Sequence, residues 1–216
     1  MELKSFIFDM DGVIIDSEPF WRQAQISILS KYEVTISIED CIQYTMGKRI
    51  DDVAFTWCQL HSLQIDPKVL EQEIINAVTT LIAEKGEAKT GLYELLDFLK
   101  ENKYQIALAT SSSLPIINAI FKRLSIAQYF EIVCSADDEV YGKPHPAVYL
   151  KAAKKLKVSP NNCVVLEDSV TGLIAAKAAA MKTVVIPEDP SDPRFRLADA
   201  IFTSMFEVIS YLDQAQ

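Results

Sequence analysis

Short apolar runs alternate with longer amphipathic stretches along most of the chain. The apolar runs predict β-strands at Leu3–Phe8, Gln105–Ala109, Glu131–Cys134, Cys163–Leu166, Thr183–Ile186 and Ala200–Phe202. Apolar residues recur with helical spacing between them, at Leu92–Glu101, Pro115–Leu124, Ala147–Leu156 and Val170–Ala180. Strands that alternate with helices favour a parallel sheet covered by helices on both faces. The pattern therefore predicts a doubly wound α/β core.

This alternation is interrupted between the first and the second predicted strand. Residues 17–84 contain only helical patterns, at Trp21–Lys31, Asp52–Leu60 and Val69–Ile82. The polar segment Glu84–Thr90 follows and contains Gly86, as expected of a hinge. A chain of 216 residues suits one large domain with an insertion. We therefore expect residues 1–16 and 85–216 to form the core, and residues 17–84 a helical-bundle cap.

Composition limits the partners of the protein. The formal net charge is −9 and no basic cluster is long enough to follow a phosphate backbone, which argues against nucleic acid. No apolar run approaches the roughly 20 residues of a membrane span. The cysteines Cys41, Cys58, Cys134 and Cys163 are far apart and lie mostly in apolar stretches, as buried thiols do. We expect a cytoplasmic protein, and a monomer whose apolar cap helices are buried internally.

Polar residues follow several of the predicted strands directly. They are Asp9 and Asp11 after the first, Thr110 and Ser111 after the second, and Glu167 and Asp168 after the fourth, with Lys143 in the loop YGKPHP. Ligands of such sheets bind beyond the carboxyl ends of the strands. Each residue alone has an ordinary explanation: Asp168 or Thr110 could cap a helix, and a loop lysine is usually solvated. Their coincidence at one edge favours a site.

These residue types suit metal-assisted phosphoryl transfer. Asp9 and Asp168, with a backbone carbonyl, make a hard-oxygen site suited to Mg²⁺. Asp9 can act as a carboxylate nucleophile that takes a phosphoryl group. Asp11, two residues on, faces the same side in an extended chain and can protonate the leaving group, then deprotonate the attacking water.

Donors for the phosphoryl oxygens lie in the same segments. The hydroxyl of Thr110 and the N–H groups of Ser111 and Met10 can bind these oxygens, next to the positive end of the following helix. Lys143 can offset the repulsion between a carboxylate and a phosphate as they approach. The sequence alone thus predicts a phosphate-processing site.

The motifs DMDGV, the apolar run ending in Thr110, GKPHP and LEDSVTG together resemble the four motifs of the haloacid dehalogenase superfamily. The chain is most similar to its phosphatase and phosphomutase branch, which has a helical cap after the first motif. The resemblance implies a Mg²⁺-dependent hydrolase of hexose and hexitol phosphates. It implies that Asp9 is the nucleophile and Asp11 the acid/base, that Thr110 and Lys143 bind phosphate, and that the metal ligands are Asp9, Asp11 and Asp168, with Glu167 supporting them.

Two features of the predicted cap bear on the substrate. The segment MGKRIDD, from Met46 to Asp52, is a loop with Arg49, at a place where relatives of β-phosphoglucomutase keep a substrate-selecting loop. It could equally be a solvated helix start with Asp51 and Asp52 in the first turn. Trp21 stands where those mutases carry a histidine, which favours a phosphatase over a phosphomutase.

Two non-enzymatic alternatives stay open. A response-regulator receiver also combines aspartates, Mg²⁺, a hydroxyl and a lysine on a parallel sheet. Receivers carry the phosphorylated aspartate on a middle strand and have no large helical insertion, whereas the D-x-D motif here follows the first strand. A catalytically silent phosphate-binding protein of the same fold is the other alternative, although every chemically required residue is present.

Overall fold

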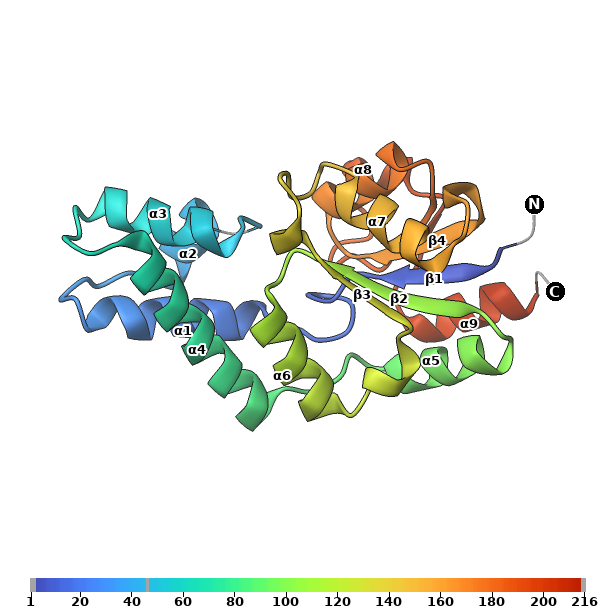
Figure 1. Ribbon diagram of the computed structural model, residues 1–216, viewed down its shortest axis with the longest axis horizontal. Helices are drawn as coiled ribbons and strands as arrows, with labels where there is room; N and C mark the ends of the chain where they lie inside the picture. The colour runs from blue at the N-terminus through green and yellow to red at the C-terminus, as the bar shows by residue number, and fades with distance from the viewer. Residues whose placement is uncertain (1–2, 46, 215–216) are drawn as a thin grey trace. The chain divides into compact units, whose positions relative to one another are not determined.

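The computed structural model describes residues 3–45 and 47–214 and forms two compact units (Figure 1). The first unit comprises residues up to Asp16, Glu87–Ser113, and residues from Ser125 onward. The second comprises Ser17–Gly86 and Leu114–Leu124. In the described part of the chain, no helix is both long enough and apolar enough to cross a membrane.

Within the described residues, the first unit is built on one parallel six-stranded sheet of order β3-β2-β1-β4-β5-β6. Its strands are β1 (Ser5–Phe8), β2 (Gln105–Thr110), β3 (Ile132–Ser135), β4 (Cys163–Glu167), β5 (Lys182–Val185) and β6 (Ala200–Ile201). All lie within two residues of the predicted ranges. The expected doubly wound α/β fold is therefore confirmed.

Helices cover both faces of this sheet. They are α5 (Leu92–Glu101), α7 (Ala147–Leu156), α8 (Val170–Ala178) and α9 (Met205–Asp213). Figure 1 shows α7 and α8 on one face and α5 and α9 on the other. Short 3₁₀ turns complete the connections: η1 (Ala127–Tyr129), η2 (Ala136–Asp138), η3 (Pro160–Asn162) and η4 (Pro193–Leu197). Because both faces are covered, β1 and β4 are buried along their whole length and read as continuous apolar runs.

One hydrophobic core lies between the sheet and the pair α7 and α8. Its members come from the central strands and from the apolar faces of both helices, and include Ile7, Ala107, Val165, Tyr149 and Ala176. Burying a large apolar side chain contributes about 1.5–3 kcal/mol to stability. This packing fixes the ends of β1, β2 and β4, from which the polar side chains extend.

The second unit is helical. It consists of α1 (Glu18–Ser30), α2 (Ile38–Tyr44), α3 (Ile50–Leu60), α4 (Pro67–Lys85) and α6 (Leu114–Leu124). The long helix α4 packs against α1, α3 and α6. The sequence assigned Leu114–Leu124 to the core, but its contacts with α4 group it with the second unit. The proposed domain boundaries, 1–16 with 85–216 and 17–84, stay a prediction.

Candidate active site

Asp9 is the first residue after β1 and is anchored to the neighbouring strand. Its backbone N–H donates to the carbonyl of Leu166 in β4 at 2.9 Å. The residue is only 7% exposed. A carboxylate so far from water needs a partner, because an unpaired buried charge is strongly destabilising.

Lys143 supplies that partner. Its Nζ lies 2.7 Å from Oδ1 of Asp9 and 2.7 Å from Oε1 of Glu167, and 4.8 Å above the ring of Tyr149. Burial of the Lys143 ammonium opposes its charge, but the two carboxylates outweigh this effect and raise its pKa. Lys143 therefore stays charged and holds Asp9 and Glu167 together.

Glu167, the last residue of β4, is fully buried and has both oxygens engaged. Oε1 accepts from Lys143 Nζ and from the hydroxyl of Tyr149, each at 2.7 Å. Oε2 accepts from the N–H groups of Asp168 and Ser169, each at 3.0 Å, and from Ser169 Oγ at 2.9 Å. Burial opposes ionisation of Glu167, but Lys143 and these donors lower its pKa. Glu167 is thus an ionised hub that joins β4, α7 and the start of α8.

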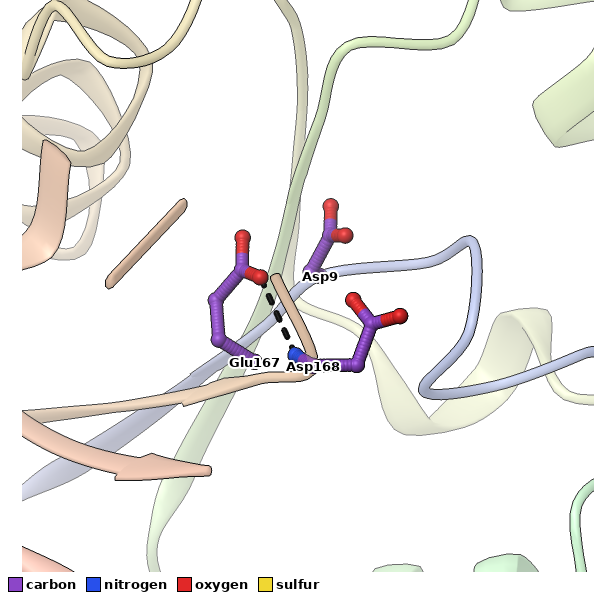
Figure 2. Close-up of side chains that lie close together, drawn as sticks. All are labelled: Asp9, Glu167 and Asp168. Carbon is purple, nitrogen blue, oxygen red and sulfur yellow. Dashed lines mark hydrogen bonds between the residues drawn. The ribbon is translucent and has the colours of Figure 1, made fainter. Parts of the chain in front are cut away.

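The carboxylates of Asp9, Glu167 and Asp168 form an acidic cluster (Figure 2). One oxygen from each lies within 4.8 Å of those from the other two. Burial, together with the neighbouring carboxylates Glu167 and Asp9, raises the pKa of Asp168 to about 9. Burial also raises the pKa of Asp9 to about 7, despite the opposing charge of Lys143. One lysine therefore does not balance this cluster.

The donor set fits a divalent cation of the Mg²⁺ type. Carboxylate oxygens are its preferred protein ligands. Because both oxygens of Glu167 already accept several hydrogen bonds, Asp9 and Asp168 would be the better ligands, and Glu167 would support them through its hydrogen bond to Asp168. A cation would also supply the positive charge that the raised pKa values of Asp9 and Asp168 call for.

Two glycines leave room for these carboxylates. Gly12 has a φ of +79°, and a Cβ there would overlap the Asp168 carboxylate. A Cβ on Gly172, in the first turn of α8, would overlap the Glu167 carboxylate. Both motif glycines are therefore required by close approach, and Gly12 also by its left-handed backbone.

Asp11 is held by the segment that follows β2. Its Oδ2 accepts a hydrogen bond from the hydroxyl of Ser112 at 2.6 Å. The N–H of Ser112 donates to Oγ1 of Thr110 at 3.0 Å. Asp11, Thr110 and Ser112 thus form a second polar group, and Gly12, which follows Asp11, passes close to the Asp168 carboxylate.

The remaining predicted residues make other contacts. Met10 is fully buried, and its carbonyl accepts from the N–H groups of Ile14 and Ile15. Ser111 is partly buried beyond the end of β2. Arg49 belongs to the second unit, directly before α3, with its Nε 3.5 Å from Asp51. Asp51 lies in the first turn of α3, as in the alternative interpretation of this loop, whereas Met46 lies outside the described residues.

Two residues of this site were missed by sequence reasoning. Ser112 sits in the run of three serines 111–113, where spacing alone does not tell which hydroxyl reaches Asp11. Tyr149 follows GKPHP by three residues and reads as an ordinary apolar position of a helix. Its hydroxyl could have indicated a polar contact, since a buried tyrosine usually needs a hydrogen-bond partner.

Known proteins resemble this chain over most of its length. The haloacid dehalogenase-like hydrolase family matches residues 3–180. Hexitol phosphatase B of Escherichia coli (strain K12) is 38% identical over 211 residues, covering 96% of this chain and 95% of that protein. Fructose-1-phosphate phosphatase YqaB of Escherichia coli (strain K12) is 33% identical and covers 82% of this chain and 93% of that protein.

A solved structure shares the fold. CbbY from Rhodobacter sphaeroides, in complex with phosphate, superposes with a TM-score of 0.85 at 23% identity, covering 95% of this chain and 96% of that one. The family expected from the four motifs is confirmed, and with it an enzyme of the hydrolase class. This chain belongs to the haloacid dehalogenase-like hydrolase family.

Proposed function

We propose that this protein is a phosphatase that hydrolyses hexose or hexitol phosphates through an aspartyl-phosphate intermediate. The observation that carries the proposal is the buried carboxylate of Asp9, which is paired with Lys143 and lies beside Asp168 at the carboxyl end of the sheet. A fixed carboxylate of this kind is a nucleophile suited to phosphoryl groups.

The relatives support this substrate class. The two relatives described above are named hexitol phosphatase and fructose-1-phosphate phosphatase. A third, from Thermotoga maritima, is named a phosphorylated carbohydrates phosphatase and is 29% identical over 84% of this chain. The likeness to a putative β-phosphoglucomutase from Thermotoga maritima, at 24% identity, concerns the fold alone. The names of the three relatives, together with Trp21 in place of the mutase histidine, favour a phosphatase over a phosphomutase.

The first chemical step transfers the phosphoryl group to the enzyme. A carboxylate oxygen of Asp9 attacks phosphorus, and the bond between phosphorus and the sugar oxygen breaks. Asp11, in its acid form, gives its proton to the leaving alkoxide, so that the sugar departs as a neutral alcohol. Asp9 then carries the phosphoryl group and Asp11 is a carboxylate.

The second step regenerates both aspartates. Asp11 takes a proton from a water molecule as its oxygen attacks phosphorus. The bond between phosphorus and Asp9 breaks, which releases inorganic phosphate and returns Asp9 to a carboxylate. The cycle consumes one water, and Asp11 ends protonated as it began, with a proton taken from that water.

Mg²⁺ is the proposed cofactor, held by the carboxylates of Asp9 and Asp168 and by the backbone carbonyl of Asp11, so that the Asp11 side chain can act as the acid. Glu167 orients Asp168 by accepting from its N–H. When bound, it would offset the charge between the phosphate and the carboxylates. Lys143 would contribute a second positive charge, fixed by Glu167. Thr110 and the N–H groups of Ser111 and Met10 would bind the phosphoryl oxygens.

The cap, residues 17–84, is proposed to select the sugar, with Arg49 as a contact for its polar groups. A cytoplasmic location and a monomeric state complete the proposal. The four cysteines are free and buried, which supports a reducing compartment.

A panel of sugar phosphates, assayed for phosphate release with and without Mg²⁺, tests the proposal. We expect turnover of hexose or hexitol phosphates that requires the metal and disappears in Asp9→Asn. Asp213→Asn, at the exposed end of α9, is the matched control and should leave activity unchanged. A folded wild-type protein that releases no phosphate from any member of the panel would exclude the proposed function.

A further inference from the structure

The hydroxyl of Ser112 has a contact that the proposed reaction does not yet use. It donates to Oδ2 of Asp11 at 2.6 Å, across 101 residues of sequence. Ser112 is only 8% exposed. The bond is strongest while Asp11 is a carboxylate, and in the acid form Oδ2 can still accept it while the proton is on Oδ1. The bond can therefore restrain the rotation of the Asp11 side chain.

Ser112 is itself fixed on two sides. Its N–H donates to Oγ1 of Thr110, and its carbonyl accepts from Oγ of Ser135 at 2.8 Å. Ser135 Oγ in turn accepts from the N–H of Asp137 at 3.1 Å. Thr110 and Ser135 are register partners at the ends of β2 and β3. The backbone of Ser112 is thus tied to two strand ends, so its hydroxyl points to Asp11 from a rigid base.

We propose that Ser112 is a positioning residue that orients the Asp11 carboxyl group for proton transfer. This inference rests on the proposed function, since it assigns a role in the same reaction. Ser112 keeps its own proton throughout. The proton that moves is that of Asp11, which goes to the sugar oxygen as the phosphorus–oxygen bond breaks and is replaced from water in the second step. A misplaced acid would slow these transfers without removing the nucleophile or the metal ligands.

Leaving-group dependence separates this role from a purely structural one. A sugar alkoxide is strongly basic and needs a proton as it leaves, whereas 4-nitrophenolate is weakly basic and leaves without one. Loss of orientation at Asp11 should therefore slow transfer from a sugar phosphate more than transfer from 4-nitrophenyl phosphate. General disruption of the site would slow both to the same degree.

The test compares Ser112→Ala with wild type on a sugar phosphate and on 4-nitrophenyl phosphate, through kcat/KM. We expect a fall of about 10- to 100-fold for the sugar phosphate, within the range that general acid catalysis supplies, and less than about threefold for 4-nitrophenyl phosphate. Ser112→Thr, which keeps a hydroxyl, should recover part of the loss.

Ser113→Ala is the matched control, because it removes a neighbouring serine hydroxyl that is also buried. Among the described residues, Ser113 Oγ has no hydrogen-bond partner. Ser113→Ala should leave kcat/KM unchanged on both the sugar phosphate and 4-nitrophenyl phosphate. Ser135→Ala is a second test if Ser112→Ala does not fold, because it removes the hydrogen bond to the Ser112 carbonyl. It should also lower kcat/KM more for the sugar phosphate than for 4-nitrophenyl phosphate, but by a smaller factor.

Each result decides the inference. A selective loss on the sugar phosphate supports it. An equal loss on both substrates, or no loss, overturns it while the proposed function stands. A wild-type protein without turnover on any phosphate ester overturns the proposed function, and with it the role of Ser112.

Discussion

Glu167 in the first unit and Gln25 in the second are both buried polar side chains that join several elements. Gln25 of α1 accepts from Trp57 Nε1 of α3 at 2.8 Å and from Thr45 Oγ1, at the end of α2, at 2.9 Å. Its Nε2 donates to the carbonyl of Trp21 at 3.2 Å. Both residues are hubs, but one is charged and the other is neutral.

The two hubs differ in the charge that they place in the interior of their units. Gln25 is satisfied by neutral partners, so it fixes how three helices meet and leaves no charge to balance. Glu167 is surrounded by Lys143, Asp9 and Asp168, which leaves an excess of negative charge beside Asp9, the proposed nucleophile. Buried charge is costly and is a frequent mark of a functional site. We therefore place the proposed chemistry in the first unit, whose hub is ionised.

Replacing the charged hub should have the largest effect. In Glu167→Gln, the new amide NH₂ must face either Lys143 and Tyr149 or the N–H groups of Asp168 and Ser169, and no orientation satisfies both pairs. We expect a loss of about 3–5 kcal/mol in the free energy of unfolding, measured by urea denaturation in the presence of a chelator.

The control is Glu101→Gln, at the exposed end of α5, which should change stability by less than about 0.5 kcal/mol. If Glu167→Gln unfolds like this control, Glu167 is not the ionised hub described above.

Replacing the neutral hub should cost less. Gln25→Leu leaves the indole N–H of Trp57 buried without its acceptor, whereas Thr45 keeps its bond to the carbonyl of Cys41. We expect a loss of about 1–3 kcal/mol, measured by urea denaturation.

Adding Trp57→Phe to Gln25→Leu removes the orphaned donor, so the double variant should lose less than the sum of the two single variants. Strict additivity would show that the Gln25–Trp57 bond does not stabilise the helical unit.

The acidic cluster should make metal binding depend on pH. The raised pKa values of Asp9 and Asp168, about 7 and about 9, mean that the folded protein holds more protons than the unfolded chain from the usual carboxyl range up to about pH 9. Stability without metal should therefore fall as pH rises through this window.

The proposed Mg²⁺ would have to displace those protons, so its affinity should rise by about tenfold per pH unit between pH 7 and 8, or about 1.4 kcal/mol. Thermal unfolding with Mg²⁺ or a chelator at several pH values measures both trends. Affinity independent of pH would contradict the assignment of Asp168 as a ligand. Because Gln25 does not titrate, the stability of the helical unit should not show this dependence on pH.

The smallest effect should come from Tyr149→Phe. The change removes the hydroxyl that donates to Glu167 but keeps the ring below Lys143. We expect a loss of about 0.5–1.5 kcal/mol, measured by urea denaturation. Tyr149→Leu removes the ring as well and should cost more. Equal losses in the two variants would assign the stabilisation to the hydroxyl alone.

Much of the fold was predictable because its signals are local. The strands β1 to β4 are apolar runs that end at or directly before a polar residue, so the ends of β1 and β4 were found next to Asp9 and at Glu167. The helix α9 was not predicted, although Ser204 and Glu207 form the start signal of a helix there, with Ser204 Oγ accepting from the N–H of Glu207. Its sequence follows the last short strand, where the alternation had already become weak.

The contacts of the site were less predictable because they join distant segments. The residue types at Asp9, Asp11, Lys143 and Asp168 indicated phosphoryl chemistry from the sequence, and their catalytic roles stay predictions. The sequence did not tell that Lys143 pairs with both Asp9 and Glu167, since the two bonds span 134 and 24 residues. Nor did it distinguish Ser112 from its serine neighbours.

By itself, the sequence determined the order of the strands and of the helices between them, the positions where β1 to β4 give way to polar residues, and the family. These features depend on hydrophobic periodicity and on residue type, which are properties of short segments. Only the tertiary structure decided which oxygen meets which donor. Pairing of β1 with β2 brings Asp11 to Ser112, and the loop that follows β3 brings Lys143 to Asp9. Such bonds depend on positions within a few tenths of an ångström that no local pattern encodes.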